Sequence, residues 1–402
     1  MPFDEPPSPA GPIGAFIALC GKAAWSERLS HLGSQVQSGS ALGRAAQQRH
    51  ALELALARLG DRKALAGASK AERHLHALAQ EAVRLADSLS PAPRARLRQE
   101  ILAGLSGQGT LIPLFHRLRT AALLRSRGFE VHFDSLTEGA PHDLRVERAG
   151  VSAEVACETI SAEEGRRLHR GDWYALVDRI NPELQTWLAA HPGRYLLKMT
   201  LPEGIAGPDQ MAELHRRISA LLATEKRQDA GAQAVLKLDP LVLAGAQAED
   251  RATGLPARLR AQFGPEAHLA VTTEAGSGSV FVMAARSSQE DEIAAAVCRR
   301  LALAAERRLS GREPGILAVF LEDLDRAEWR NLREQLELEG AIRRFLTTPA
   351  ARRVVAVSCT SRFELFGGAP PDAAPEGELR FRNPAHPAAR LPALAPAVLS
   401  SM

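Results

Sequence analysis

The sequence has little cysteine, few aromatic residues and very little lysine. Its four cysteines, Cys20, Cys157, Cys298 and Cys359, are widely separated, which fits neither a disulfide framework nor a zinc cluster. Aromatic residues make up 4% of the chain, which argues against a surface on which single-stranded bases stack. Lysine occurs only six times, so arginine carries nearly all the positive charge. The cysteine pattern is typical of a reducing compartment, and we expect a cytoplasmic protein.

Several signatures of other protein classes are also missing. The apolar run 12–25 is too short to cross a bilayer, and it follows an acidic, proline-rich start that differs from a secretory signal. The sequence contains no glycine-rich loop ending in Gly-Lys-Ser or Gly-Lys-Thr and no His-Glu-x-x-His pair, which excludes the enzymes with those signatures. We expect no membrane partner. The net charge of +3 permits a nucleic-acid partner without requiring one.

The residues that are present divide the chain into four parts. Both ends, 1–12 and 367–402, are rich in proline and small residues, and we predict that they are disordered. Residues 13–108 have apolar side chains at helical spacing, interrupted by proline and glycine, and this predicts an all-helical N-terminal region. Residues 109–366 are predicted to form an α/β domain.

Helical and extended patterns alternate within this domain. Its first part predicts, in order, a helix over 111–126, strands over 129–133, 142–148 and 151–160, a helix over 162–191 and a strand over 194–201. The turn at Ala149-Gly150 makes the second and third strands a hairpin. The second part predicts helices over 208–228, 288–309 and 326–346 and extended segments over 234–244, 268–274, 279–285, 315–323 and 352–362. This order is typical of a mixed sheet flanked by helices.

Carboxylates gather on the predicted hairpin. Asp143 lies on its first arm, and alternation along the second arm places Glu154, Ala156 and Glu158 on one face. Cys157 points to the other face, where we expect a buried, apolar role. Carboxylate oxygens are the ligands that Mg²⁺ prefers. The pattern therefore predicts a candidate site for a hard divalent cation.

The run GFEVHF…PHDLRVERAGVSAEVACET resembles the core of PD-(D/E)XK nucleases, the restriction-endonuclease-like family. Pro-His-Asp at 141–143 matches the P-D element, and Glu154-Val155-Ala156 matches E-x-K with alanine in place of lysine. The resemblance covers about 110–200, and the later run LALAAERRLSGREPGILAVFLED is similar to the continuation in relatives. It implies a restriction-endonuclease-like mixed sheet and metal-dependent hydrolysis of phosphodiester bonds in DNA or RNA.

The resemblance also implies roles for individual residues. Asp143 and Glu154 would be catalytic and would hold Mg²⁺, which neutralises phosphate charge and lowers the pKa of an attacking water. Many relatives carry a further acidic metal ligand on the first helix, whereas the helix 111–126 contains no acidic residue. Glu138 or Glu158 would have to replace that ligand, and we include Glu158 among the predicted metal ligands. In the family the lysine orients the water or stabilises developing charge, and Ala156 can do neither.

Two sources of positive charge are candidates to replace the missing lysine. Lys198 would be the third catalytic residue if its strand neighbours Glu154. A basic cluster follows the acidic strand and is a candidate nucleic-acid-binding site, although such clusters are more often a solvated helix face: Arg166, Arg167, His169 and Arg170.

Three interpretations follow from these residues. The chain is a nuclease that uses Mg²⁺, or a catalytically inactive relative that binds nucleic acid or, through its N-terminal helical region, a protein partner, or an unrelated mixed α/β protein. The alternative interpretation of Asp143 and Glu154 themselves is that they are simply solvent-facing residues of an edge hairpin. A cationic head group that converges with the carboxylates favours the enzyme, and apolar packing around Ala156 favours the inactive relative.

Overall fold

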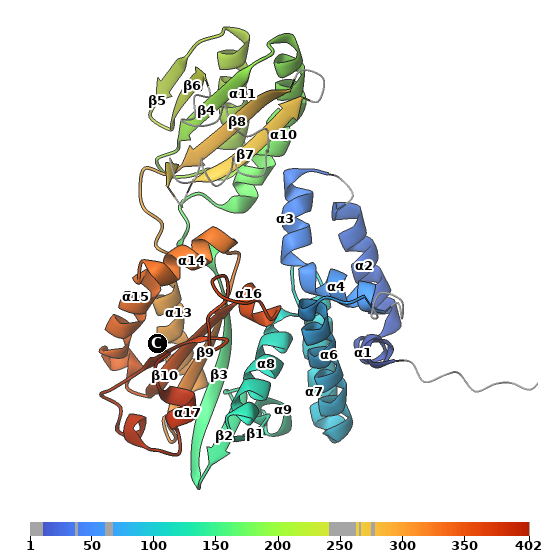
Figure 1. Cartoon of the computed structure of the whole chain (residues 1–402), viewed down its shortest axis with the longest axis vertical. Helices are drawn as coiled ribbons and strands as arrows, with labels where there is room; N and C mark the ends of the chain where they lie inside the picture. Colours follow the sequence, from blue (N-terminus) through green and yellow to red (C-terminus); the bar gives the residue numbers. More distant parts are fainter. Residues whose placement is uncertain are drawn as a thin grey trace, which may run out of the picture. The chain divides into compact units, whose positions relative to one another are not determined.

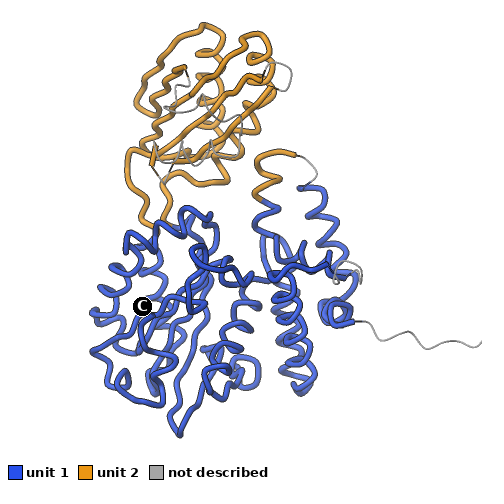
Figure 2. Tube along the Cα trace, viewed as in Figure 1, with its two compact units in different colours: residues 1–37, 46–164, 294–402 blue, residues 38–45, 165–293 orange. Residues whose placement is uncertain are grey.

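The computed structural model describes residues 11–36, 39–60, 67–240, 263–264, 267–274 and 278–401. The chain forms two compact units (Figure 2): unit 1 contains residues 1–37, 46–164 and 294–402, and unit 2 contains 38–45 and 165–293. The larger part of unit 2 is therefore inserted, in sequence, between two parts of unit 1. The prediction of one α/β domain over 109–366 was wrong, because the chain leaves the first sheet after the hairpin and builds a second sheet.

Unit 1 begins with helices, as predicted for 13–108. The helices up to the first strand are α1 (Pro12–Cys20), α2 (Lys22–Val36), α3 (Ala41–Arg49), whose first residues belong to unit 2, α4 (Ala51–Leu59), α6 (Lys70–Ser88), α7 (Pro91–Leu105) and α8 (Ile112–Ser126). Ser69 caps α6 in a capping box with Glu72, the usual device for satisfying free N–H groups at a helix start. The predicted disorder of 1–12 falls mostly outside the described residues.

The rest of unit 1 alternates strands with helices (Figure 1). Its elements up to the insertion are β1 (Glu130–His132), α9 (Asp134–Thr137), β2 (Leu144–Arg148), β3 (Val151–Ser161) and η1 (Ala162–Gly165). After the insertion come α13 (Ile293–Arg308), β9 (Gly315–Glu322), α14 (Arg326–Glu334), α15 (Glu337–Leu346), η2 (Pro349–Ala351), β10 (Val354–Ser361), α16 (Arg362–Leu365), β11 (Leu379–Arg382), η3 (Pro387–Arg390) and α17 (Ala395–Val398).

The strands of unit 1 form one mixed sheet in the order β1-β2-β3-β9-β10-β11. The first three strands are antiparallel, β9 runs parallel to β3, and β10 runs parallel to β9. The predicted hairpin is confirmed, with Leu144 paired to Val155 and Arg145 paired to Glu154. Ala149 and Gly150 both have positive φ, 51° and 74°, as a two-residue hairpin turn that follows the strand twist requires.

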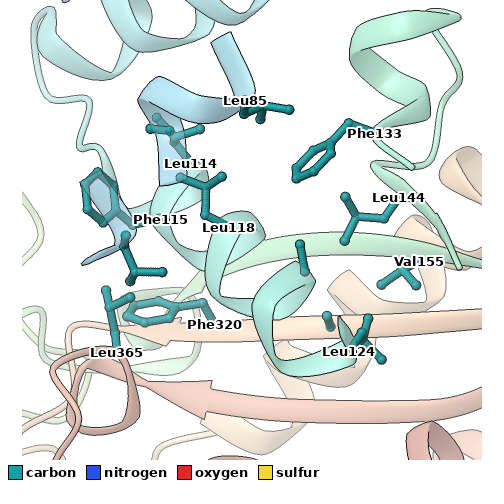
Figure 3. Packing of buried hydrophobic residues seen from close by; sticks show 14 of the residues in the cluster. Leu85, Leu114, Phe115, Leu118, Leu124, Phe133, Leu144, Val155, Phe320 and Leu365 are labelled. Carbon is teal, nitrogen blue, oxygen red and sulfur yellow. The ribbon is translucent and has the colours of Figure 1, made fainter. Parts of the chain in front are cut away.

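Helix α8 packs its apolar side chains on one face of this sheet. Leu118 and Leu124 of α8 lie over Leu144, Val155 and Phe320 of β2, β3 and β9, and all five are buried (Figure 3). The N-terminal helices α1, α4, α6 and α7 contribute to the same apolar cluster. The N-terminal helical region is therefore part of the core of unit 1. Burial of each large apolar side chain contributes roughly 1.5–3 kcal/mol.

The other face of the sheet carries the alternate residues of the central strands. Leu317 and Val319 of β9 are fully buried there. Burial, and to a smaller extent the neighbouring Cys298 thiol of α13, raises the pKa of the Cys359 thiol of β10 well above its ordinary value. Helix α13 therefore covers this face, and the loop 309–314 joins its C-terminal end to β9.

The C-terminal tail is ordered, which corrects the prediction of disorder for 367–402. β11 pairs antiparallel with β10 and forms the edge of the sheet. Leu394 and Val398 are fully buried in the apolar cluster of unit 1. The prediction failed because small apolar residues and prolines, which cannot form a core alone, fill space against a sheet that already exists.

Unit 2 contains the second sheet. Among the residues described, its elements are α10 (Arg170–Ala190), β4 (Arg194–Thr200), α11 (Gly207–Ala223), β5 (Gln228–Gly231), β6 (Ala234–Pro240), β7 (His268–Glu274) and β8 (Ser279–Arg286). The strand order is β5-β6-β4-β8-β7, and α10 packs against β7, β8 and α11. In the described part of the chain, no helix has the length and apolar character needed to cross a membrane.

Candidate functional site

The predicted carboxylates lie where the β2–β3 hairpin meets the end of α13. Asp143 immediately precedes β2, and its backbone N–H donates to the carbonyl oxygen of Val155 at 3.0 Å. Glu154 is in β3, between β2 and β9. The side chains of Asp143 and Glu154 are 10% and 5% exposed. The interpretation of both residues as solvent-facing is therefore wrong.

Asp143 is held by donors from three segments. Its Oδ2 atom accepts hydrogen bonds from the backbone N–H of Cys157 at 2.6 Å and from Nη2 of Arg308 at 2.7 Å. Its Oδ1 atom lies 3.5 Å from Nη1 of Arg117, a buried residue of α8 that also pairs with Glu100. Two guanidinium groups therefore compensate the charge of this carboxylate.

Glu154 has a separate set of donors. The backbone N–H of Ser310 donates to Oε2 at 2.7 Å, and the Ser310 hydroxyl donates to Oε1. Nδ1 of His142 lies 3.7 Å from Oε1, and Nε2 of the same ring is 3.3 Å from Oδ2 of Asp134. Both oxygens of Glu154 are thus engaged by the loop between α13 and β9.

Arg308, the last residue of α13, is the centre of the site. Its Nη2 donates to Asp143 and its Nη1 donates to Oε1 of Glu158, each at 2.7 Å. It also donates to the carbonyl oxygens of Cys157 at 2.9 Å and Pro141 at 3.0 Å. Burial alone lowers the pKa of the guanidinium, but the carboxylates of Asp143 and Glu158 raise it above its ordinary value, so Arg308 stays charged.

Ala156 and Cys157 show how the strand separates its two faces. Ala156 is fully buried and pairs with Leu317 of β9. Cys157 packs against the cluster under α8, as the alternation predicted. Burial raises the pKa of the Cys157 thiol well above its ordinary value, so this thiol is uncharged at neutral pH. Neither residue adds a charged or nucleophilic group to the site.

The site does not fit the Mg²⁺ that the resemblance implies. Arg308 and Ser310 already occupy oxygens of Asp143, Glu154 and Glu158. Within the described ranges, no three His, Cys, Asp or Glu side chains are grouped so that they could hold a metal ion. Glu138, the other predicted substitute ligand, ends the short helix α9.

Lys198 lies on the second sheet. Its strand β4 pairs with β6 and β8, and its Nζ atom forms an ion pair with Asp239 of β6 at 3.0 Å. The condition under which Lys198 would serve the site, a strand adjacent to that of Glu154, is not met. β4 is the next strand after the hairpin in sequence, but it belongs to unit 2, and the two strands therefore lie in different sheets.

The basic cluster lies around the start of α10. The predicted helix over 162–191 is interrupted, because η1 ends at Gly165 and α10 begins at Arg170. Arg166 is buried, and Arg167 pairs with Glu292 at 2.8 Å. His169 is the N-cap residue of α10. Each of these residues has a partner within the chain.

Sequence reasoning missed Arg308 and Ser310. Both lie in the run ERRLSGREPG, whose resemblance to the family continuation we noted without assigning any residue a role. The order of the elements was the available signal. Because β9 runs parallel to β3, the two strands start at the same edge of the sheet, and the helix that precedes β9 ends close to the start of β3.

Comparisons with protein-family models, curated proteins and solved structures gave no match.

Proposed function

We propose that unit 1 contains a restriction-endonuclease-like core that has lost cleavage and that the protein binds nucleic acid without hydrolysing it. The order of elements supports the fold: helix α8, the antiparallel strands β1 to β3, helix α13 and then β9 parallel to β3. This is the order expected from the resemblance, with unit 2 inserted between β3 and α13. The fold alone does not determine the activity.

The observation that carries the loss of cleavage is the state of the two carboxylates. A catalytic carboxylate must present oxygens to a metal ion, whereas those of Asp143 and Glu154 accept hydrogen bonds from Arg308 and Ser310. Arg308 does bring a cation to the site, which is the feature expected of an enzyme. It occupies the carboxylate oxygens, however, and a guanidinium is a poor general base.

Nucleic acid is the ligand class that the resemblance implies. The chain is rich in arginine, which binds phosphate groups in a bidentate manner. A protein partner that docks on the N-terminal helices is the alternative ligand. Because those helices share the core of unit 1, such a partner would contact the same compact unit as the carboxylates.

The test is a paired cleavage and binding assay on the full chain. Single- and double-stranded DNA and RNA are incubated with the protein in Mg²⁺ and in Mn²⁺, and binding is measured by fluorescence anisotropy at several salt concentrations. We expect no cleavage above that of an Asp143→Ala variant, together with binding that weakens as salt increases.

Two results would contradict the proposal. Metal-dependent cleavage that is lost in both Asp143→Ala and Glu154→Ala would establish a nuclease and remove the claim of inactivity. Absence of binding to all four nucleic acids would remove the nucleic-acid part and leave the protein partner as the ligand to seek.

A further inference from the structure

We infer that unit 1 binds the phosphate backbone of a nucleic-acid duplex along one edge of its sheet, the edge at which β9 and β10 begin. The inference rests on the proposed function and deepens it, because it names the binding surface and the form of nucleic acid that this surface fits. It depends on how charge is distributed within unit 1, since the net charge of the whole chain is only +3.

Three segments of the chain meet at this edge. The guanidinium of Arg353 donates to the carbonyl oxygens of Leu309 at 2.8 Å and Glu306 at 3.3 Å, so the segment before β10 lies against the end of α13. The side-chain amide of Asn383, directly after β11, donates to the carbonyl oxygen of Val354 at 2.8 Å. The three segments therefore form one surface. We call it the basic edge, and it contains residues 306–314, 349–354 and 382–390.

The basic edge carries arginines whose guanidinium groups have no partner. Among the residues that the structure describes, five arginines of this surface form no side-chain hydrogen bond or ion pair: Arg307, Arg312, Arg352, Arg382 and Arg390. All of them except Arg382 are exposed. The acidic residues of the same segments are Glu306 and Glu313. A guanidinium without an internal partner is available to bind a phosphate group in a bidentate manner.

The opposite edge of the same sheet has the reverse charge. β3 and β9 run parallel and both end there. The residues at or just after these strand ends are mainly acidic: Glu163, Glu164, Glu322, Asp323, Asp325 and Glu328. A polyanion is therefore attracted to the basic edge and repelled by the opposite one. The small net charge of the chain conceals this separation.

A duplex fits the basic edge better than a single strand does. In the described part of the chain no large aromatic side chain is exposed, so unpaired bases have no ring on which to stack. The surface offers positive charge instead. A duplex carries about one negative charge per 1.7 Å of its axis, which is twice the density of a single strand. We therefore expect contacts to phosphates and little dependence on base sequence.

The experiment measures the binding of short fluorescent DNA and RNA duplexes, and of their single strands, to the full chain by anisotropy over a series of salt concentrations. The test variant is Arg312→Gln with Arg352→Gln, because neither guanidinium holds another part of the described chain. The matched control is Arg49→Gln with Arg326→Gln, which removes the same charge from the opposite edge, where both side chains are exposed.

We expect the test variant to bind the duplex about tenfold more weakly, or weaker still, at about 0.1 M salt. The slope of the logarithm of affinity against the logarithm of salt concentration should become smaller by about two, one for each lost phosphate contact. The control variant should bind as the wild type does. Arg312→Lys with Arg352→Lys should keep most of the affinity, because an ammonium group also neutralises phosphate.

Thermal unfolding of each variant checks that a loss of binding does not reflect a loss of structure. A wild type that binds the duplex, with the same affinity lost in the test and control variants or in neither, overturns the inference. A single strand that binds as tightly as the duplex also overturns it. A wild type that binds no nucleic acid refutes the proposed function itself and this inference with it, so the two failures are distinguishable.

Discussion

Replacing Asp143 with alanine is expected to destabilise unit 1 by about 3 kcal/mol. The substitution leaves the guanidinium groups of Arg308 and Arg117 without this carboxylate. Breaking a buried ion pair by removing one partner costs roughly 3–5 kcal/mol. We take the lower end because the Arg308 side chain is 27% exposed and water screens part of its charge.

This magnitude is large enough to separate a structural carboxylate from a functional one. Carboxylates kept for metal binding repel one another when no metal is bound, and their removal commonly leaves stability unchanged or raises it. Removal of a carboxylate that pairs with two arginines instead lowers the stability. The sign of the change in unfolding free energy therefore reports on the role of Asp143.

The assay is thermal unfolding of the wild type, Asp143→Ala and a matched Asp87→Ala control. Asp87 pairs with Arg94 at 3.4 Å, and its side chain is 64% exposed, so its replacement should change stability by less than about 0.5 kcal/mol. A loss of about 3 kcal/mol lowers the melting temperature by roughly 6–12 °C. Hydrogen exchange in peptides from β2 and β3 shows whether unit 1 is the part that loosens.

An Asp143→Ala variant as stable as the wild type, or more stable, would refute this reasoning. The same result would mean that Arg308 and Arg117 find other partners or water at little cost. A loss of stability equal in Asp87→Ala and Asp143→Ala would also count against it, because it would show no dependence on burial.

Three further predictions concern other buried polar groups. Ser310→Ala removes the hydroxyl donor to Glu154 and should cost about 1–2 kcal/mol in urea unfolding, whereas Ser310→Thr should keep most of the stability. Burial lowers the pKa of His116 from 6.5 to about 4, so between these values the unfolded chain takes up a proton that the folded chain does not. The free energy of unfolding should therefore fall by up to about 3 kcal/mol as pH drops from 6.5 to 4, and His116→Gln should reduce this dependence on pH. Burial, with help from Asp323, raises the pKa of Glu322 from 4.5 to about 7, so stability should decrease as pH rises through this window, and Glu322→Gln should be more stable than the wild type at about pH 8 in thermal unfolding.

The local structure around the site was predictable because it depends on neighbouring residues. The alternation in 151–160 and the pair Ala149-Gly150 defined the hairpin, and alternation placed Cys157 on the apolar face. The helix over 111–126 followed from its apolar spacing and its glycine end. The structure confirms each of these elements within a few residues.

The long-range arrangement was not predictable from these patterns. Lys198 follows the hairpin in sequence, yet its strand joins a second sheet, because strand pairing depends on contacts that no local pattern encodes. Arg308 is 165 residues from Asp143 in sequence, and only the parallel pairing of β9 with β3 brings them together. The C-terminal residues looked disordered because their burial depends on a core built by other segments.

Anomalous diffraction from wild-type crystals soaked in Mn²⁺ tests most directly whether Arg308 holds the carboxylates in place of a metal ion. The account predicts that the guanidinium of Arg308 stays bonded to Asp143 and Glu158 and that no anomalous peak lies at coordination distance from either carboxylate. A manganese peak shared by Asp143 and Glu154, with Arg308 displaced, would contradict it.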